Sequence, residues 1–285
     1  MRRFGRCFDK LSTNGEGFSS QALQRIKGNM TDAFFLADGD AYLPQPICRG
    51  PWDPGSLNGR VVAGLLGAVV EARHGAAGWL PARMTVDMYR LPRFEPVTIE
   101  TSAVRDGGRL RLVTASFVSG GVPMALATVQ FLRLGENAGG TVWKPETWDA
   151  PPPAAVPPPE TGFGMWDFRP VSGAFGFAER RRGWMREKRP AVAGLALTPW
   201  ARAAAACDFA SPFAHSGSQG LGYINTDVTL ALHRLPAGEW IGLEAGYHDA
   251  DAGVALGQCR LFDEAGPIGL ATCLALAQRQ ALTPR

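Results

Sequence analysis

Two stretches of this 285-residue chain share one pattern at a constant offset of 144 residues. Residues 89–92 (YRLP) recur as residues 233–236 (HRLP), and the same offset superposes residues 127–128 (AT) on residues 271–272 (AT). Around both copies, apolar and polar residues alternate in short runs that are separated by turn-forming residues, which is typical of antiparallel strands packed on one face. The repeat therefore predicts two copies of one strand meander.

A helical pattern precedes the first meander. Residues 58–74 (NGRVVAGLLGAVVEARH) are apolar on nearly every side and carry charge only near the two ends. Such a helix is surrounded by other structure rather than lying on a surface, and Asn58 or Ser56 is a suitable N-cap. Gly64 and Gly67 each cost about 1 kcal/mol in helix propensity relative to alanine. This cost indicates that another backbone or a ligand comes very close there.

The second meander has a helix of its own. Thr198 and Pro199 fit an N-cap followed by proline at the first helical position, and residues 200–210 continue the helix. One copy alone would leave an open sheet edge, which is an aggregation hazard. We therefore expect an α+β protein in which two helix-wrapped antiparallel sheets fuse into one continuous sheet. A chance similarity between two unrelated meanders is the alternative.

The remaining segments suggest how the chain is divided. Residues 1–29 are polar and lack the apolar stretch of a secretory signal, so we expect a disordered or dispensable extension. Residues 30–134 and 163–280 are the expected N-terminal and C-terminal units. The prolines within residues 135–162 predict an extended linker between them.

Composition excludes several classes of protein. The chain is 46% hydrophobic and 19% charged, as expected of a globular protein, and its net charge of +3 with scattered arginines does not favour nucleic acid as a partner. No run of 18 apolar residues predicts a membrane span, and we expect a cytoplasmic protein. Five cysteines without a CxxC or Cys/His cluster indicate free thiols in a reducing compartment and no metal site. Serine-hydrolase, NTPase and Rossmann motifs are missing.

Basic residues gather early in the second unit. A solvated rim is one interpretation, and a patch that attracts the phosphates of a nucleotide-bearing ligand is the other. The residues are Arg180, Arg181, Arg182, Arg186, Lys188 and Arg189.

A helix followed by a four-strand meander, duplicated with a linker, resembles the double hot-dog acyl-CoA thioesterases (thioesterase II-like, within the broader thioesterase-like superfamily). The resemblance covers about residues 33–278 and implies hydrolysis of an acyl-CoA thioester to free acid and CoA, in lipid metabolism, without a metal or other cofactor. The segments that carry it are residues 49–72 (RGPWDPGSLNGRVVAGLLGAVVEA), 180–187 (RRRGWMRE), 226–234 (TDVTLALHR), 238–240 (GEW) and 257–278 (GQCRLFDEAGPIGLATCLALAQ).

The resemblance also implies site residues. In that family an Asp at the start of a second-half strand, a Thr or Ser on the next strand and a Gln on the last strand orient the water that attacks the thioester. These positions fall at Asp227, near His248 and at Leu274. The chain thus keeps the Asp, has His in place of the hydroxyl and lacks the Gln. Gln130 is the first-half counterpart of Leu274, but it is not assumed to substitute.

The chemistry expected of these residues is general-base catalysis. An Asp in a partly dry cleft orients water and accepts its proton, and a His with an ordinary pKa of about 6.5 suits neutral pH. Because Asp227 and His248 lie on successive strands of the meander, cross-strand contact between them is feasible, and the sequence leaves open whether their side chains point to the same face. Thr229 shares a face with Asp227 and is a candidate for substrate contact. The alternatives are that Asp227 caps a strand start and that His248 is an exposed loop residue.

The start of the first helix is the expected oxyanion site. Backbone N–H groups near Asn58 and Gly59, or at the second-half counterpart of this helix start, would hold the oxyanion. Ala63, Gly64 and Gly67 would leave room for the acyl chain between helix and sheet. Two rival functions remain open. A non-catalytic acyl-CoA-binding or scaffold protein is suggested by the missing Gln, and a hot-dog enoyl-CoA hydratase, which uses an Asp/His pair, lacks its usual Gly-Asp-x-Asn-Pro signature. Association into a homodimer is also left open.

Overall fold

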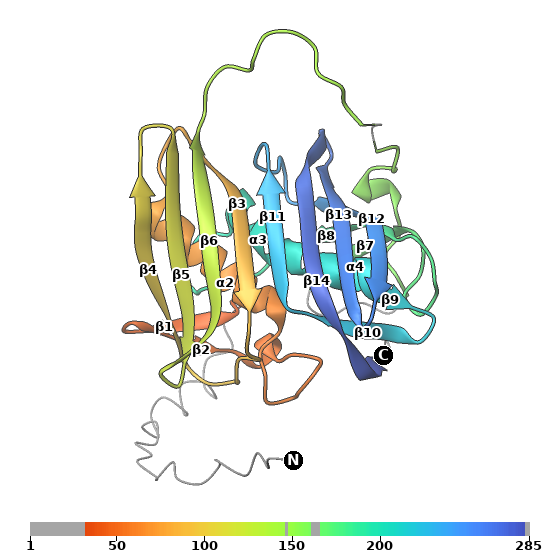
Figure 1. Ribbon diagram of the computed structural model, residues 1–285, viewed down its shortest axis with the longest axis horizontal. Coiled ribbons are helices and arrows are strands. Elements are labelled where there is room, and N and C mark those ends of the chain that lie inside the picture. The colour runs from red at the N-terminus through yellow and green to blue at the C-terminus, as the bar shows by residue number, and fades with distance from the viewer. Residues whose placement is uncertain (1–31, 146–147, 161–165, 283–285) are drawn as a thin grey trace, which may run out of the picture. The chain divides into compact units, whose positions relative to one another are not determined.

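The two predicted units share one antiparallel sheet, as the repeat predicts. The computed structural model describes residues 32–145, 148–160 and 166–282. Its strands form one 14-stranded sheet, in which β3 (Trp79–Met88) of the first half pairs with β11 (Asp227–Leu232) of the second. Figure 1 shows this sheet with the helices on one of its faces. The expected extension, residues 1–29, lies outside the described residues, and the expected boundaries of the two units stay predictions.

The first half begins with a short hairpin and continues with the buried helix and its meander. Its elements are β1 (Phe35–Asp38), β2 (Ala41–Pro44), η1 (Pro46–Cys48), α2 (Gly59–His74), β3, β4 (Val97–Asp106), β5 (Leu110–Ser119) and β6 (Val122–Arg133).

The second half repeats this order. Its elements are η2 (Pro153–Ala155), β7 (Asp167–Ser172), β8 (Arg182–Arg186), α3 (Pro199–Ala206), η3 (Cys207–Phe209), α4 (Ala210–His215), β9 (Ser216–Gly217), β10 (Gly220–Asn225), β11, β12 (Ile241–Asp251), β13 (Val254–Asp263) and β14 (Gly266–Leu282).

The repeat is visible at the junction of the two halves. Thr85 of β3 lies opposite Thr229 of β11, and their Oγ1 atoms are 3.1 Å apart. These two residues are separated by 144 positions, the same offset as in the sequence repeat. They are therefore equivalent residues of the two copies that meet where the two sheets join.

Helix α2 is buried, as its sequence predicts. Asn58 caps it by accepting a hydrogen bond on its side chain from Arg60 N at 3.0 Å. A Cβ at Gly67 would lie 2.5 Å from Ala204 Cβ of α3, and one at Gly64 would lie 3.3 Å from Ala205 Cβ. The two glycines thus allow the second helix to approach closely. The sequence indicated that either another backbone or a ligand lies near them, and the structure places the backbone of α3 there.

The second helix differs from the expected continuous one. After Ala206 the chain tightens into the 3₁₀ turn η3 and resumes as α4, which ends at His215. The break places Asp208 at the junction of two helical segments rather than on a regular helix face. None of the helices in the described part of the chain is both long and apolar enough to cross a membrane.

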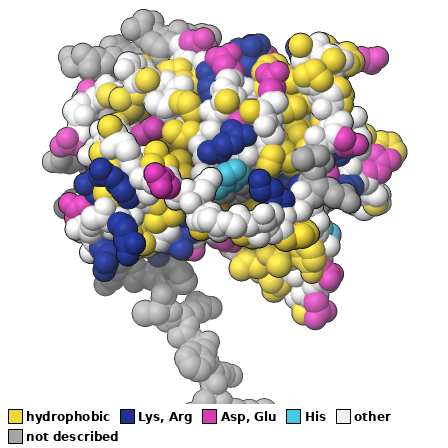
Figure 2. All heavy atoms as spheres, turned by 90° about the horizontal axis from the view of Figure 1, so that it is seen from above, with side chains coloured by type: hydrophobic (Ala, Val, Ile, Leu, Met, Phe, Trp, Pro, Cys, Tyr) yellow, Lys and Arg dark blue, Asp and Glu magenta, His cyan; other side chains and the backbone are white. Residues whose placement is uncertain are grey.

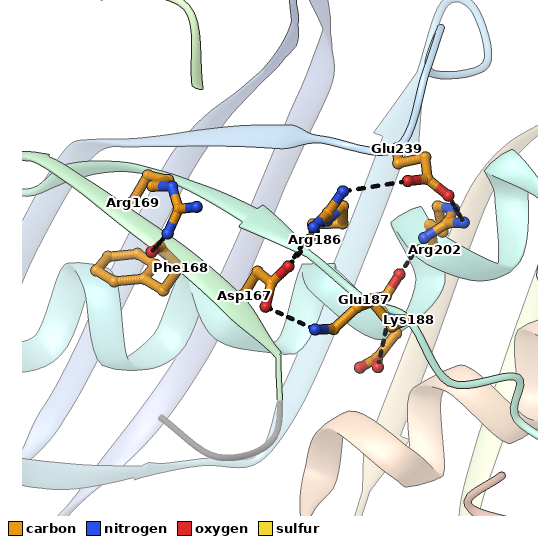
Figure 3. A network of polar contacts seen from close by, with 8 residues as sticks. All are labelled: Asp167, Phe168, Arg169, Arg186, Glu187, Lys188, Arg202 and Glu239. Carbon is orange, nitrogen blue, oxygen red and sulfur yellow. Dashed lines mark hydrogen bonds and ion pairs between the residues drawn. The ribbon is translucent and has the colours of Figure 1, made fainter. Parts of the chain in front are cut away.

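Most of the basic cluster is held in ion pairs. Asp167 binds Arg186 and Lys188, and Glu239 binds both Arg186 and Arg202 of α3, so this network ties β7 and β8 to the second helix (Figure 3). Seen from above, charged side chains of both signs are interspersed with hydrophobic ones (Figure 2).

Candidate active site

A cavity of about 410 Å³ lies at the N-terminal end of α2. Its lining is largely hydrophobic and comes from both halves: the start of α2, the segment after β3, the α3–α4 junction and β10. The polar residues that line it are Asn58, Gly59, Arg60, Tyr89, Arg90, Asp208, Ser211, Ser216, Asn225 and Thr226. Largely apolar cavities of this size with a few convergent polar groups are the usual form of small-molecule sites.

Asp208 is the carboxylate of this cavity. Its Oδ1 accepts a hydrogen bond from Asn225 Nδ2 at 2.9 Å. The carboxylate lies directly over the first residue of α2, because a Cβ built on Gly59 would lie 2.8 Å from Oδ1 and 2.9 Å from Oδ2. Burial raises the pKa of Asp208, while the hydrogen bond from Asn225 and the charge of Arg60 oppose that rise. A carboxylate with a raised pKa is a better proton acceptor near neutral pH.

The start of α2 offers a free donor beside this carboxylate. The backbone N–H of Asn58 donates to Cys48 O at 2.8 Å, and those of Val61 and Val62 donate to Asn58 O. Within the described residues, the N–H of Gly59 has no acceptor. Of the two predicted oxyanion residues, Gly59 therefore has its N–H available, whereas Asn58 acts as the helix cap.

Beneath the cavity, Arg60 is 1% exposed and forms an ion pair with Glu187. Its guanidinium lies 4.0 Å from the ring centroid of Trp166 and 4.7 Å from that of Phe34. Burial lowers the pKa of Arg60 to about 10 and raises that of Glu187. The charge of Arg60 acts on Asp208, and keeping this ion pair away from water has a considerable desolvation cost.

Asp227 lies elsewhere in the sheet. Val228 and Leu230 belong to the core, so alternation places Asp227 and Thr229 on the face away from the helices. Asp227 Oδ1 accepts a hydrogen bond from Leu274 N at 2.7 Å, where β10 gives way to β11. Burial, together with the nearby charge of Asp87, raises its pKa. This contact is the strand-start cap that the sequence left as an alternative.

Asp227 and His248 do not form the cross-strand contact that successive strands of a meander would allow. In the sheet order, β14 and β13 lie between β11 and β12, so the two residues are about 14 Å apart along the sheet at the usual strand spacing. The order of strands along the chain differs from their order in the sheet. The last strand, β14, pairs with β11, so β12 lies two strands further away. Thr229 contacts Thr85 instead of either residue.

His248 lines a second cavity and has a different partner. Its Nδ1 is 2.9 Å from Nδ1 of His215, the last residue of α4. Leu274, at the expected Gln position, is 47% exposed. Gly64 does not line the first cavity, and the room that it was expected to leave for an acyl chain is taken by Ala205.

Comparison with protein families decides what kind of protein this is. Residues 48–132 match the model of the acyl-CoA thioesterase N-terminal domain, and residues 144–277 match that of the C-terminal domain. The chain belongs to the acyl-CoA thioesterase family. Comparison with curated proteins gives no match.

Solved structures show the same fold at low sequence identity. A hot-dog protein of unknown function from Alicyclobacillus acidocaldarius is 19% identical with a TM-score of 0.70, covering 88% of this chain and 98% of that one. Acyl-CoA thioesterase II TesB2 from Mycobacterium marinum is 19% identical with a TM-score of 0.59, covering 87% and 94%. The tesB protein of Mycobacterium avium subspecies paratuberculosis is 14% identical with a TM-score of 0.63, covering 91% and 99%. The double hot-dog fold of the thioesterases is therefore present over nearly the whole described chain.

Asp208 and Asn225 are the two hydrogen-bonded cavity residues that the sequence analysis did not single out. One signal was available, because Asp208 is the only carboxylate in the largely apolar stretch of residues 200–214. No group of three His, Cys, Asp or Glu side chains in the described ranges is arranged to hold a metal ion.

If acyl-CoA is hydrolysed in this cavity, replacing Gly59 with alanine is expected to lower thiol release at least tenfold. The added methyl group would meet both carboxylate oxygens of Asp208 within 3 Å, so Asp208 must move, and misplaced catalytic groups are costly on this scale. Steady-state thiol release measures the effect. Gly108→Ala, in the β4–β5 turn with nothing within 4 Å of its added Cβ, is the control, and equal activity of both variants would contradict the expectation.

His215 makes stability depend on pH. Burial, reinforced by the charge of His248, lowers the pKa of His215 to about 4, whereas a histidine in an unfolded chain titrates near 6.5. Between these values the unfolded chain binds a proton that the folded chain does not. The free energy of unfolding should therefore fall as pH drops from about 6.5 to about 4, by at most about 3 kcal/mol.

Urea unfolding at pH 7 and pH 5 measures this effect. His215→Gln should show a shallower fall in stability than the wild type, and His233→Gln, at an exposed position, should match the wild type. Parallel pH profiles for wild type and His215→Gln would show that His215 does not carry the dependence.

Proposed function

We propose that this protein hydrolyses acyl-CoA thioesters in the cavity at the start of α2, with Asp208 as general base. The observation that carries the proposal is the juxtaposition of the Asp208 carboxylate with Gly59, whose backbone N–H is unpartnered, inside a largely apolar cavity. Thioester hydrolysis needs a proton acceptor for water and a donor for the oxyanion, and both lie here within one site.

The reaction follows from these positions. Asp208 accepts a proton from a bound water as the water oxygen attacks the thioester carbonyl carbon. The carbonyl oxygen, now negatively charged, accepts a hydrogen bond from Gly59 N–H, with the positive end of the α2 dipole behind it. Collapse of the intermediate breaks the carbon–sulfur bond, and the leaving thiolate takes the proton from Asp208. The products are a free carboxylic acid and CoA.

Asn225 is a positioning residue in this scheme. Its side-chain amide donates to Asp208 Oδ1, which holds the carboxyl plane and leaves Oδ2 for water. Hydrophobic side chains are suited to the acyl group and exclude bulk water. They include Leu57, Val62, Met88, Phe209, Leu221 and Ile224.

A non-catalytic acyl-CoA-binding protein is the second candidate. It is favoured by Leu274, an exposed apolar residue at the position where the resembled family has its Gln. A catalytic role for Asp227 also stays a prediction, although its hydrogen bond to Leu274 N supports a role as a strand cap.

A panel of acyl-CoAs of increasing chain length, assayed for free thiol, tests the proposal. Saturable thiol release with at least one chain length is expected. Tight binding of acyl-CoA without thiol release at any chain length would favour the binding protein, and loss of enoyl absorbance without thiol release would favour the hydratase.

A further inference from the structure

The second cavity, of about 590 Å³, is separated from the first by the turn after α4. Ser216 lines both cavities. The second one has a more polar lining than the first, and its walls come from the segment before β8, the end of α4, β10 and β12. Its polar lining residues are Glu179, Arg180, Arg181, His215, Ser216, Ser218, Gln219, Tyr223, Tyr247 and His248.

Positive charge predominates in this cavity. Arg181 is 2% exposed and donates hydrogen bonds to the backbone oxygens of Phe213 and Phe177, but no carboxylate in the described ranges forms an ion pair with it. Its Nε has no hydrogen-bond partner there. Arg180 pairs with Glu244 at 2.9 Å, and Glu244 is shared with Arg260 at 3.3 Å. Glu244 is thus shared among several arginines, and Glu179 acts on Arg181 through its charge without a direct ion pair in the described residues. A buried guanidinium without a direct ion-pair partner favours an anionic ligand.

A chain of hydrogen bonds makes His248 a further donor. Cys273 Sγ lies 3.3 Å from Nε2 of His215, and burial raises the pKa of this thiol to about 12, so it remains protonated and is able to donate to that nitrogen. In the tautomer that accepts this hydrogen bond, His215 carries its proton on Nδ1 and donates to Nδ1 of His248. His248 is left with its proton on Nε2. Because His248 is exposed and lines the cavity, this N–H is available to a ligand.

Aromatic rings complete the cavity. Tyr223 packs against both histidines, with ring centroids 5.7 Å from His215 and 5.8 Å from His248. Tyr247, the neighbour of His248 on β12, is 49% exposed. An exposed aromatic ring beside arginine and histidine donors suits a base that stacks and phosphates that accept hydrogen bonds.

We propose that this cavity holds the phosphate-bearing adenine nucleotide of the CoA thioester, while the acyl group occupies the cavity at the start of α2. The proposal rests on the proposed function for the identity of the ligand. Ser216 lines both cavities, so the two lie next to each other at this turn, as an extended ligand that occupies both requires.

Calorimetric titration with CoA alone tests the site independently of hydrolysis. Arg180→Ala, His248→Ala and Tyr247→Ala are each expected to weaken CoA binding about tenfold, as for the loss of one charged or stacking contact. Arg109→Ala, an exposed arginine in the β4–β5 turn of the first half, is the matched control and should bind as the wild type does. Adenosine 3′,5′-bisphosphate should compete with CoA, which distinguishes a nucleotide site from a general anion site.

Kinetics with two substrates give a second readout. With acyl-CoA as substrate, the variants should have a raised KM and a smaller change in kcat. The acyl-pantetheine thioester lacks the nucleotide, so the variants should lose about tenfold less kcat/KM with it than with acyl-CoA. Wild-type affinity for CoA in the Arg180→Ala/His248→Ala double variant, or displacement of CoA by inorganic phosphate as readily as by the bisphosphate, would overturn the proposal. Affinity for CoA that depends on Arg180, in a protein that releases no thiol, would sustain this inference and refute the proposed hydrolysis.

Discussion

Replacing Asp208 with asparagine is expected to lower kcat for acyl-CoA hydrolysis by about 10²–10⁴-fold, the usual contribution of a general base. The amide keeps the size of the carboxyl group and can still accept a hydrogen bond from Asn225, which donates to Oδ1 in the wild type. It cannot take a proton from water. KM should change little, because the substitution removes a group that acts in the transition state. Thiol release under saturating acyl-CoA measures the effect.

The same assay separates the two candidate carboxylates. Asp227→Asn should retain most of the activity if Asp227 serves as a cap for Leu274 N, and Asp251→Asn, at the exposed end of β12, controls for the loss of one negative charge. Thermal unfolding of all three variants distinguishes loss of chemistry from loss of fold. Abolished hydrolysis in Asp227→Asn with normal hydrolysis in Asp208→Asn would transfer the role of general base to Asp227.

Removing one charge of the Arg60–Glu187 pair should lower the free energy of unfolding by about 3–5 kcal/mol. Both side chains are nearly inaccessible, with 2% and 6% of their surface exposed. Glu187→Gln keeps the Oε1 acceptor for the N–H groups of Lys188 and Arg189 but leaves the guanidinium of Arg60 buried without its anion. Urea unfolding at pH 7 provides the measurement.

A double-mutant cycle tests whether the pair itself carries the effect. Arg60→Met retains packing against Trp166 and Phe34, which flank the guanidinium. In combination with Glu187→Gln it should cost less than the sum of the single substitutions, by about 0.5–3 kcal/mol. Asp106→Asn, in the exposed Asp106–Arg111 pair, should change stability by less than about 1 kcal/mol. Additive single substitutions would mean that the two charges do not depend on each other.

Much of the fold follows from local pattern. The apolar residues of α2 recur at the helical period, and the alternation in β3 and β11 marks one apolar face on each strand. The repeat adds that both copies have the same structure, so their equivalent edges can pair, and Thr85 does lie opposite Thr229. Part of the candidate site could also be predicted from local pattern. The capping residue Asn58 marks the start of α2, and this locates the backbone N–H of Gly59.

Other features depend on contacts between distant segments. The break in the second helix has no strong local signal, since Cys207 and Asp208 follow a run of alanines that continues a helix well. When β11 pairs with β3 on one edge, its other edge is open, and β14 pairs there. The resulting order of the last strands separates Asp227 from His248. The meeting of His215, His248 and Cys273 likewise depends on how α4 packs across β13 and β14.

The sequence by itself determined the repeat and the buried first helix, because periodicity and capping are properties of neighbouring residues, and the family entered through the resemblance of its motif segments to the double hot-dog thioesterases. Only the tertiary structure decided which carboxylate faces the start of α2. Asp208 and Gly59 are far apart in the chain, and the carboxylate reaches the glycine because Gly64 and Gly67 allow the two helices to approach closely. A site assembled across such an interface depends on packing between side chains that no local pattern relates.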